Sequence, residues 1–226
     1  MRVMDKGRPS RERETGSLEP PGGGDGLAGV DPSEPKLTAL GPTEGYLHGQ
    51  LLIATPSIGD SRFEHTVLMV CEHDETQAMA LVVNRPLQGL TAPALLKRLG
   101  FSGGAPEGPV FYGGPVERER GYVLHSDDYA SQSSLEVAPG ILLTDTRDVL
   151  EALGDPTRRP RRSLLALGYA GWGAGQLEVE IRQGAWLTCE PDESLVFGRD
   201  VNARWTAAMG KLGVQPERLS AVVGRA

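Results

Sequence analysis

Residues 163–180 read SLLALGYAGWGAGQLEVE, and the order of residue types in this stretch decides the fold. The apolar run from Leu164 to Leu167 has the length of a buried strand. Four glycines between positions 168 and 175 follow it and predict a turn. Beyond the turn, Leu177 and Ile181 are four residues apart, as on one face of a helix. The stretch therefore predicts a strand, a glycine turn and a helix, in that order.

Two aromatic residues, Tyr169 and Trp172, fall within the predicted glycine turn. Glycines allow positive φ angles and let other groups approach the backbone closely. The start of the following helix leaves N–H groups free, which is the usual setting of an anion site. Tyr169 and Trp172 are therefore candidate binding residues. The alternative is that the glycines only allow tight packing and that the two aromatic rings fill the core.

The composition indicates a globular protein. The chain has 226 residues, of which 39% are apolar and 23% charged, enough for one core or at most two small domains. It has no run of about 18 apolar residues that could span a membrane and no apolar segment of a secretory signal near its start. Two cysteines are too few for a disulfide framework. We therefore expect a cytoplasmic protein.

The net charge is −7. Residues 1–44 contain six Lys and Arg against eight Asp and Glu, so this segment and the remainder are both negative. A nucleic-acid-binding surface needs clustered positive charge. The charge distribution therefore argues against direct DNA binding.

The chain divides at about residue 44. Residues 1–44 are rich in Gly, Pro and charged residues and have few large apolar side chains. Such a segment buries too little surface to offset the entropy of ordering. We expect a disordered N-terminal tail over residues 1–44 and a single domain over residues 45–226.

Within the domain, short apolar stretches bounded by turn residues predict the strands. They are residues 50–54, 66–71, 79–83, 109–112, 121–125, 135–137, 141–143, 163–169, 185–188 and 195–197. Helices are predicted over residues 90–99, from about 145 to 153, from about 174, and over 201–212. Some strands are joined by tight turns and others by helices, which predicts an α+β fold with a mixed sheet.

Five stretches in this order resemble the YqgE/AlgH family of small bacterial proteins. They are QLLIATPSIGD with Phe63, VLMVCEHDETQAMALVVNRP, VFYGGPVERERGYVLH, GYAGWGAGQLEVEI with AWL, and LVF. The resemblance extends from about Gly45 to the C-terminus.

The resemblance implies an α+β fold with a branched sheet and a small barrel-like part, surrounded by helices. It implies no settled biochemical activity, although some family members carry a transcriptional-regulator label. Three positions depart from the family pattern, one of them Gly184, which begins the sequence GAWL where the family has NxWL. Ala80 stands where the family tends to have glycine, and Arg225 replaces a histidine near the C-terminus, which weakens any mechanism that needs a C-terminal imidazole.

Cys71, Glu72 and His73 form the best chemical cluster in the sequence. Alternation along a strand predicts that Cys71 and Glu72 point to opposite faces. A nearby protonated histidine could lower the thiol pKa and produce a thiolate. The alternative is a buried, inert cysteine followed by two polar turn residues. We predict that these three residues and the Tyr169–Trp172 turn line one concave site.

The sequence favours neither a metal nor a cofactor. His73, His125, Asp127 and Asp128 lack the spacing of a dedicated metal site. Phosphate-loop and nucleophile-elbow motifs are absent. Four arginines form the one dense basic cluster, which we interpret as a solvated loop; the alternative is contact with an acidic partner or a phosphate. They are Arg158, Arg159, Arg161 and Arg162.

Three functions are compatible with these observations. We favour a non-enzymatic regulatory module that binds an unknown small molecule or partner protein, because the sequence contains no catalytic constellation. The alternative is a thiol-dependent enzyme or redox sensor that uses Cys71. Direct regulation through DNA is the weakest, because the sequence is acidic and contains no recognisable helix-turn-helix.

Overall fold

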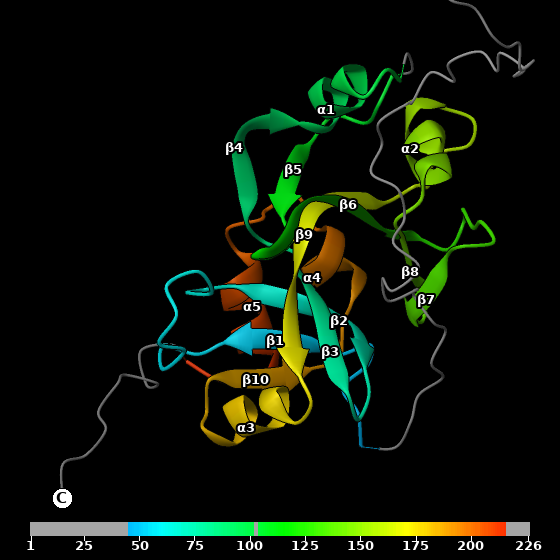
Figure 1. Ribbon diagram of the computed structural model, residues 1–226. Helices are drawn as coiled ribbons and strands as arrows, with labels where there is room; N and C mark the ends of the chain where they lie inside the picture. The colour runs from blue at the N-terminus through cyan, green and yellow to red at the C-terminus, as the bar shows by residue number, and fades with distance from the viewer. Residues whose placement is uncertain (1–44, 102–103, 216–226) are drawn as a thin grey trace, which may run out of the picture. The chain divides into compact units, whose positions relative to one another are not determined.

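The computed structural model describes residues 45–101 and 104–215, and this part of the chain contains ten strands and five helices (Figure 1). The strands are β1 (Leu51–Ala54), β2 (Val67–His73), β3 (Gln77–Val82), β4 (Pro86–Thr91), β5 (Pro109–Tyr112), β6 (Val116–Ser126), β7 (Leu135–Ala138), β8 (Ile141–Thr144), β9 (Ser163–Gly173) and β10 (Trp186–Cys189). The helices are α1 (Ala92–Arg98), α2 (Arg147–Gly154), α3 (Gln176–Arg182), α4 (Glu193–Phe197) and α5 (Arg204–Lys211).

Strand β9 is the centre of the sheet. Its first part pairs with β6 along one edge, while β5 pairs in parallel with the other edge at Ala166 and Leu167. Its last four residues pair with β3. The main path through the sheet is β10-β1-β2-β3-β9-β6-β8-β7, with β5 and β4 branching from β9. The predicted α+β fold with a mixed, branched sheet is therefore confirmed.

The predicted glycine turn is wrong, because β9 continues as a strand from Ser163 through Gly173. The helix that follows begins at Gln176, close to the predicted start. Of the four glycines, Gly175 alone lies between strand and helix, with φ of 70°. The two aromatic residues therefore lie in a strand, where they point to opposite faces of the sheet.

Close approach of two backbone segments explains the glycines at positions 113 and 168. Gly113 donates a hydrogen bond from its N–H to the carbonyl oxygen of Leu167, at 2.8 Å, and accepts one from the N–H of Val82, also at 2.8 Å. A Cβ atom on Gly113 would lie 2.1 Å from the carbonyl oxygen of Gly168, and Gly168 has φ of 73°. Neither position can accept a side chain without moving the backbone.

Strand β7, at the end of the main path, lies against β2, so this part of the sheet curls into a barrel-like arrangement. The contact requires a glycine at position 49, where a Cβ atom would lie 2.6 Å from the carbonyl oxygen of Val137. The predicted barrel-like part is therefore confirmed. Its interior is filled by the largest buried cluster, which includes Met69, Leu124 and Leu143.

Helices cover the remaining faces of the sheet. Helix α3 packs through Leu177 against β1, β2 and β3, and it lies beside β10 at the lower end of Figure 1. Helices α4 and α5 contribute Leu195 and Met209 to the barrel-like cluster. Helices α1 and α2 contribute to a third cluster against β5, β6 and β9. The predicted surrounding helices are therefore confirmed.

One other prediction of local structure is wrong, and one strand was not predicted. Residues 195–197 form part of helix α4, because the Asp192 carboxylate accepts a hydrogen bond from the N–H of Leu195 at 3.0 Å and caps the helix. The helix predicted over residues 90–99 is confirmed as α1, which begins at Ala92 after Thr91 as its N-cap. Strand β4 precedes it and was not predicted, because none of its residues is buried and its sequence lacks the alternation typical of a strand.

None of the helices in the described part of the chain has the length and apolar character needed to span a bilayer. The predicted tail, residues 1–44, lies outside the described residues.

Candidate functional site

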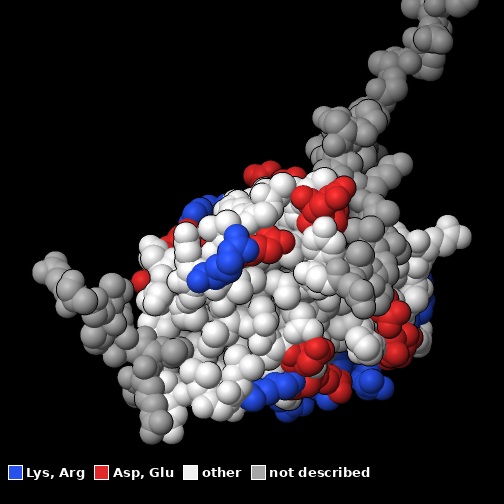
Figure 2. Space-filling view, turned by 90° about the horizontal axis from the view of Figure 1, so that it is seen from below, with Lys and Arg blue, Asp and Glu red and all other residues white. Residues whose placement is uncertain are grey.

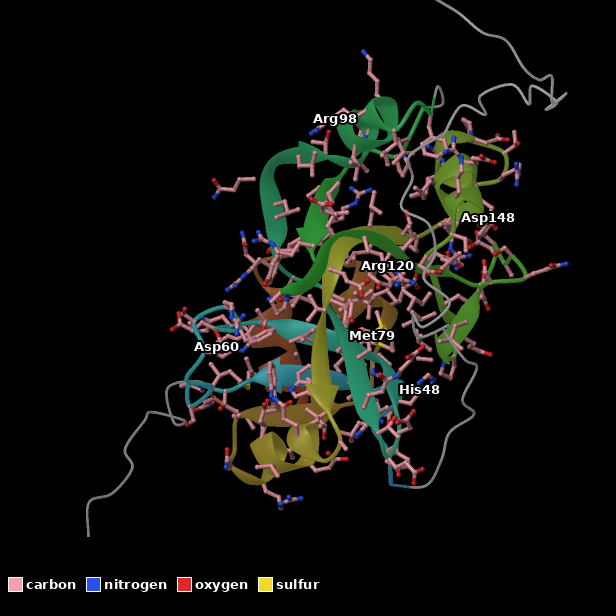
Figure 3. All side chains as sticks on the ribbon, in the orientation of Figure 1. His48, Asp60, Met79, Arg98, Arg120 and Asp148 are labelled. Atoms are coloured by element: carbon pink, nitrogen blue, oxygen red, sulfur yellow. The ribbon has the colours of Figure 1, made fainter. Side chains whose placement is uncertain are left out.

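A β-bulge in β2 positions the Cys71–His73 cluster. Val70 pairs with Ala80 and Glu72 pairs with Met79, so Cys71 is one extra residue on β2. Directly paired residues share a face, and Met79 lies in the same core cluster as Cys71. Cys71 and Glu72 therefore share one face and His73 takes the other, so the predicted alternation of Cys71 and Glu72 is wrong. Figure 3 labels Met79 on β3, the strand between β2 and β9.

The Cys71 thiol is enclosed by the core. Its side chain is fully buried, and its Sγ donates to the carbonyl oxygen of Met69 at 3.4 Å. Burial, with the nearby Glu72 carboxylate, raises the pKa of the thiol well above its usual range. The thiolate that a nucleophile or redox sensor needs is therefore disfavoured in the folded protein.

Both ring nitrogens of His73 have partners. The N–H of Leu47 donates to Nδ1 at 2.9 Å, so Nδ1 carries no proton. Nε2 then carries the proton and donates to the Glu178 carboxylate of α3, also at 2.9 Å. The ring of Tyr46 packs edge-on against the imidazole, with centroids 5.1 Å apart. His73 therefore joins the segment before β1 to helix α3 and has no nitrogen available as a base.

Trp172 shares the His73 face of the sheet and is buried beneath α3. Its indole N–H donates to Oε2 of Glu180 at 2.9 Å. The indole of Trp186 donates to the same oxygen at 2.8 Å, and the two rings are 6.0 Å apart. This geometry agrees with the core interpretation of Trp172.

Tyr169 lies on the other face, where Glu72 is one of the charges that act on it. Its ring meets Tyr122 edge-on at 5.9 Å, and burial raises the pKa of its phenol. The five predicted residues are thus neighbours across β3, but the sheet separates them into two sets. Cys71, Glu72 and Tyr169 lie on one face, and His73 and Trp172 lie on the other.

A hollow of about 280 Å³ is formed where the end of β6 and the turn between β7 and β8 face the segment from β10 to α4. We call it the α4 hollow. Its lining combines apolar side chains with charged ones, as ligand sites commonly do. The lining residues are Ser126, Asp127, Pro139, Gly140, Ile141, Arg161, Glu190, Pro191, Asp192, Glu193 and Phe197.

Most charged groups around the α4 hollow are paired. Glu193 bonds to Arg162 at 2.8 Å, and Asp192 bonds to Lys211 at 2.9 Å. By contrast, the Asp127 carboxylate and the Arg161 guanidinium form no hydrogen bond to another residue in ranges 45–101 and 104–215. The side chains of Asp127 and Arg161 therefore keep their hydrogen-bonding groups open to solvent or to a ligand, although the charge of Arg161 also acts on Asp128.

Sequence reasoning did not find the α4 hollow, because its residues come from five separated segments. The one available signal was the arginine-rich loop, from which Arg161 lines the hollow and Arg162 pairs with Glu193 at its rim. Within the described residues, no group of three or more His, Cys, Asp and Glu side chains could hold a metal ion.

Comparison with known proteins shows to which family this chain is similar. A family model described as AlgH-like matches residues 51–217. A UPF0301 protein of Caulobacter vibrioides is 55% identical over 184 residues, covering 80% of this chain and 94% of that protein. A UPF0301 protein of Rhodospirillum rubrum is 44% identical, covering 84% and 99%.

Solved structures are similar as well, two of them over most of the chain. The solution structure of AlgH from Pseudomonas aeruginosa has a TM-score of 0.65 and 39% identity, covering 83% of this chain and all of that chain. Protein DIP2367 from Corynebacterium diphtheriae has a TM-score of 0.58 over 81% of this chain and 94% of that chain. Its 19% identity supports a common fold alone.

Proposed function

Because the chain belongs to the AlgH-like family, we propose that it is a non-enzymatic module that binds a small molecule or partner protein in the cytoplasm. Its regulatory role, suggested by the label of some family members, is exerted through that contact. The observation that carries the proposal is the α4 hollow, with Asp127 and Arg161 uncommitted on its lining. A ligand that carries both an amino and a carboxylate group complements these two charges.

The thiol alternative is disfavoured by the position of Cys71. A buried thiol with a raised pKa reacts slowly. We expect the native protein to react with a thiol reagent such as Ellman's reagent at least about a hundredfold more slowly than the urea-unfolded chain. The Cys189→Ser variant isolates the signal of Cys71. Rapid labelling of that variant at pH 7 would support the thiol-dependent alternative instead.

Direct DNA binding is also disfavoured. The chain is negative overall, and the face drawn in Figure 2 carries scattered acidic and basic groups separated by wide uncharged areas. Nucleic-acid surfaces instead concentrate Lys and Arg.

The α4 hollow can be tested by charge reversal. Asp127→Lys and Arg161→Glu each reverse one uncommitted charge, and Glu107→Lys is the matched control on an exposed residue away from the hollow. Amino acids and related zwitterions are screened for ligands that raise the melting temperature of the native protein. We expect ligands to stabilise the native protein and the control, but neither hollow variant. Ligands that stabilise all four proteins equally would exclude the hollow as the site.

A further inference from the structure

A second group of polar side chains surrounds Tyr112 of β5, and none of them lines the α4 hollow. We call it the Tyr112 cluster; its members are Arg62, Arg85, Arg118 and Tyr112. The Arg118 guanidinium lies over the Tyr112 ring, 5.9 Å from its centroid. Arg62 lies near Tyr112, whose phenol is among the groups that influence the pKa of its guanidinium. The Arg85 backbone lies beside that of Tyr112, because the N–H of Tyr112 donates to the Arg85 carbonyl oxygen at 2.8 Å.

The positive charge of the Tyr112 cluster is only partly compensated. Arg62 has a carboxylate partner, Asp60, at 2.7 Å, which Figure 3 labels in the loop between β1 and β2. Arg85 donates to the backbone carbonyl oxygens of Arg62 and Glu64, the latter at 3.1 Å. Across ranges 45–101 and 104–215, neither Arg85 nor Arg118 pairs with a carboxylate, and the Tyr112 hydroxyl has no hydrogen-bond partner.

The fold holds these groups in place. Val116 pairs with Tyr169 and Gly121 pairs with Leu167, so four residues of β6 bulge out from the sheet and carry Arg118 outward. Glu117 at the start of this bulge has φ of 46°, a left-handed backbone that L-residues rarely adopt. Arg85 is fixed by two carbonyl contacts to the loop after β1. The fold therefore fixes the backbone from which Arg118 projects and the side chain of Arg85.

We propose that the Tyr112 cluster binds carboxylate side chains in an acidic segment of a partner protein. The inference rests on the proposed binding function and specifies its partner. Guanidinium groups match carboxylates in a bidentate geometry, and the free tyrosine hydroxyl adds one donor.

The exposure of the cluster favours a macromolecular partner over an enclosed small ligand. The Arg62 side chain is 59% exposed and Arg118 is also exposed. The net charge of −7 favours a peptide that makes a few local contacts over a nucleic acid, whose many phosphates would be repelled by the rest of the surface.

The test uses the full chain and a fluorescein-labelled hexaglutamate peptide, with fluorescence anisotropy at low salt. Arg118→Gln removes one uncommitted guanidinium and Tyr112→Phe removes the hydroxyl. Arg182→Gln on α3 is the matched control, because it removes one exposed arginine elsewhere. We expect Arg118→Gln to weaken binding about fivefold to tenfold and Tyr112→Phe about threefold. The control should bind like the native protein, and added salt should weaken binding.

Other results of this experiment would overturn the proposal or replace its ligand. Equal binding by native protein, Arg118→Gln and Arg182→Gln would overturn the proposal, as would no binding to the native protein. Stronger binding of a single-stranded oligonucleotide of equal charge, or complete competition by millimolar inorganic phosphate, would replace the acidic segment with a phosphate-bearing ligand. The two proposals fail separately, because peptide anisotropy and the melting-temperature screen for the α4 hollow are read independently on the native protein.

Discussion

The Glu180 carboxylate joins helix α3 to two buried indoles, and its removal should be costly. Oε2 accepts hydrogen bonds from Trp172 and Trp186, at 2.9 and 2.8 Å, while Oε1 accepts one from Gln176 at 2.9 Å. Hydrogen bonds to charged groups contribute about 1.5–3 kcal/mol each, and a buried donor left without a partner costs a similar amount. Glu180 is itself partly buried, and we expect Glu180→Leu to lower the free energy of unfolding by about 2–4 kcal/mol.

Glu180→Gln separates the hydrogen bonds from the charge. The amide keeps an oxygen acceptor, so we expect a loss of only about 1 kcal/mol. Urea unfolding followed by far-ultraviolet circular dichroism gives both values, provided the m-values agree. Glu151→Ala, which removes an exposed pair with Arg147, is the control and should change stability by less than about 0.5 kcal/mol.

A double-mutant cycle tests the specific contact. Trp172→Phe keeps an aromatic ring but removes the N–H, so its coupling to Glu180→Leu should be at least about 1 kcal/mol. Coupling near zero, or equal losses for Glu180→Leu and Glu180→Gln, would refute the assignment of the indole N–H groups to this carboxylate.

Two further predictions concern the backbone and the pH dependence. Gly168→Ala should lower the free energy of unfolding by more than about 2 kcal/mol, because φ is 73° and the new Cβ would lie 2.6 Å from the carbonyl oxygen of Gly114. Gly173→Ala is the control in urea unfolding, because a Cβ at that position meets no neighbour. Equal losses for the two variants would contradict the steric argument. Burial lowers the pKa of His125 below its ordinary value, about 6.5 in the unfolded chain. At pH values between these two pKa values, the folded state binds fewer protons than the unfolded chain. The contribution of neutral His125 to the free energy of unfolding is therefore complete above about pH 6.5, and it is lost as pH falls through the lower pKa of the folded state. The urea midpoint should therefore fall less between pH 7 and 5.5 in His125→Gln than in the native protein, and identical falls would contradict this.

The sequence was informative wherever a signal was local. The apolar run at Leu164 and the spacing of Leu177 and Ile181 gave the strand and helix of the central stretch. The glycines were read as a turn because local sequence does not distinguish a flexible turn from a strand that another backbone approaches closely. Gly168 is required by Gly113 and Gly114, more than fifty residues earlier, and that relation appears only in the folded chain.

The candidate site shows the same limit. The Cys71 bulge depends on counting residues of β2 against those of β3, so alternation along β2 alone assigned Glu72 to the wrong face. Trp172 could be assigned to the core only after its partner Glu180 was known. The N-cap at Asp192, in contrast, was a readable signal for α4, but the short apolar LVF segment favoured a strand.

Strand β9 pairs with three other strands, and this arrangement limits how the domain can open locally. Its eleven residues pair with β3, β5 and β6, and it contributes to all three buried clusters. Separating β9 from any neighbour exposes parts of more than one cluster, so partial opening has little energetic advantage over complete unfolding. Amide hydrogens in the middle of β9 should exchange with solvent only through global unfolding. We therefore expect residues 45–101 and 104–215 to unfold in one cooperative transition, which circular dichroism and tryptophan fluorescence should report at the same urea concentration.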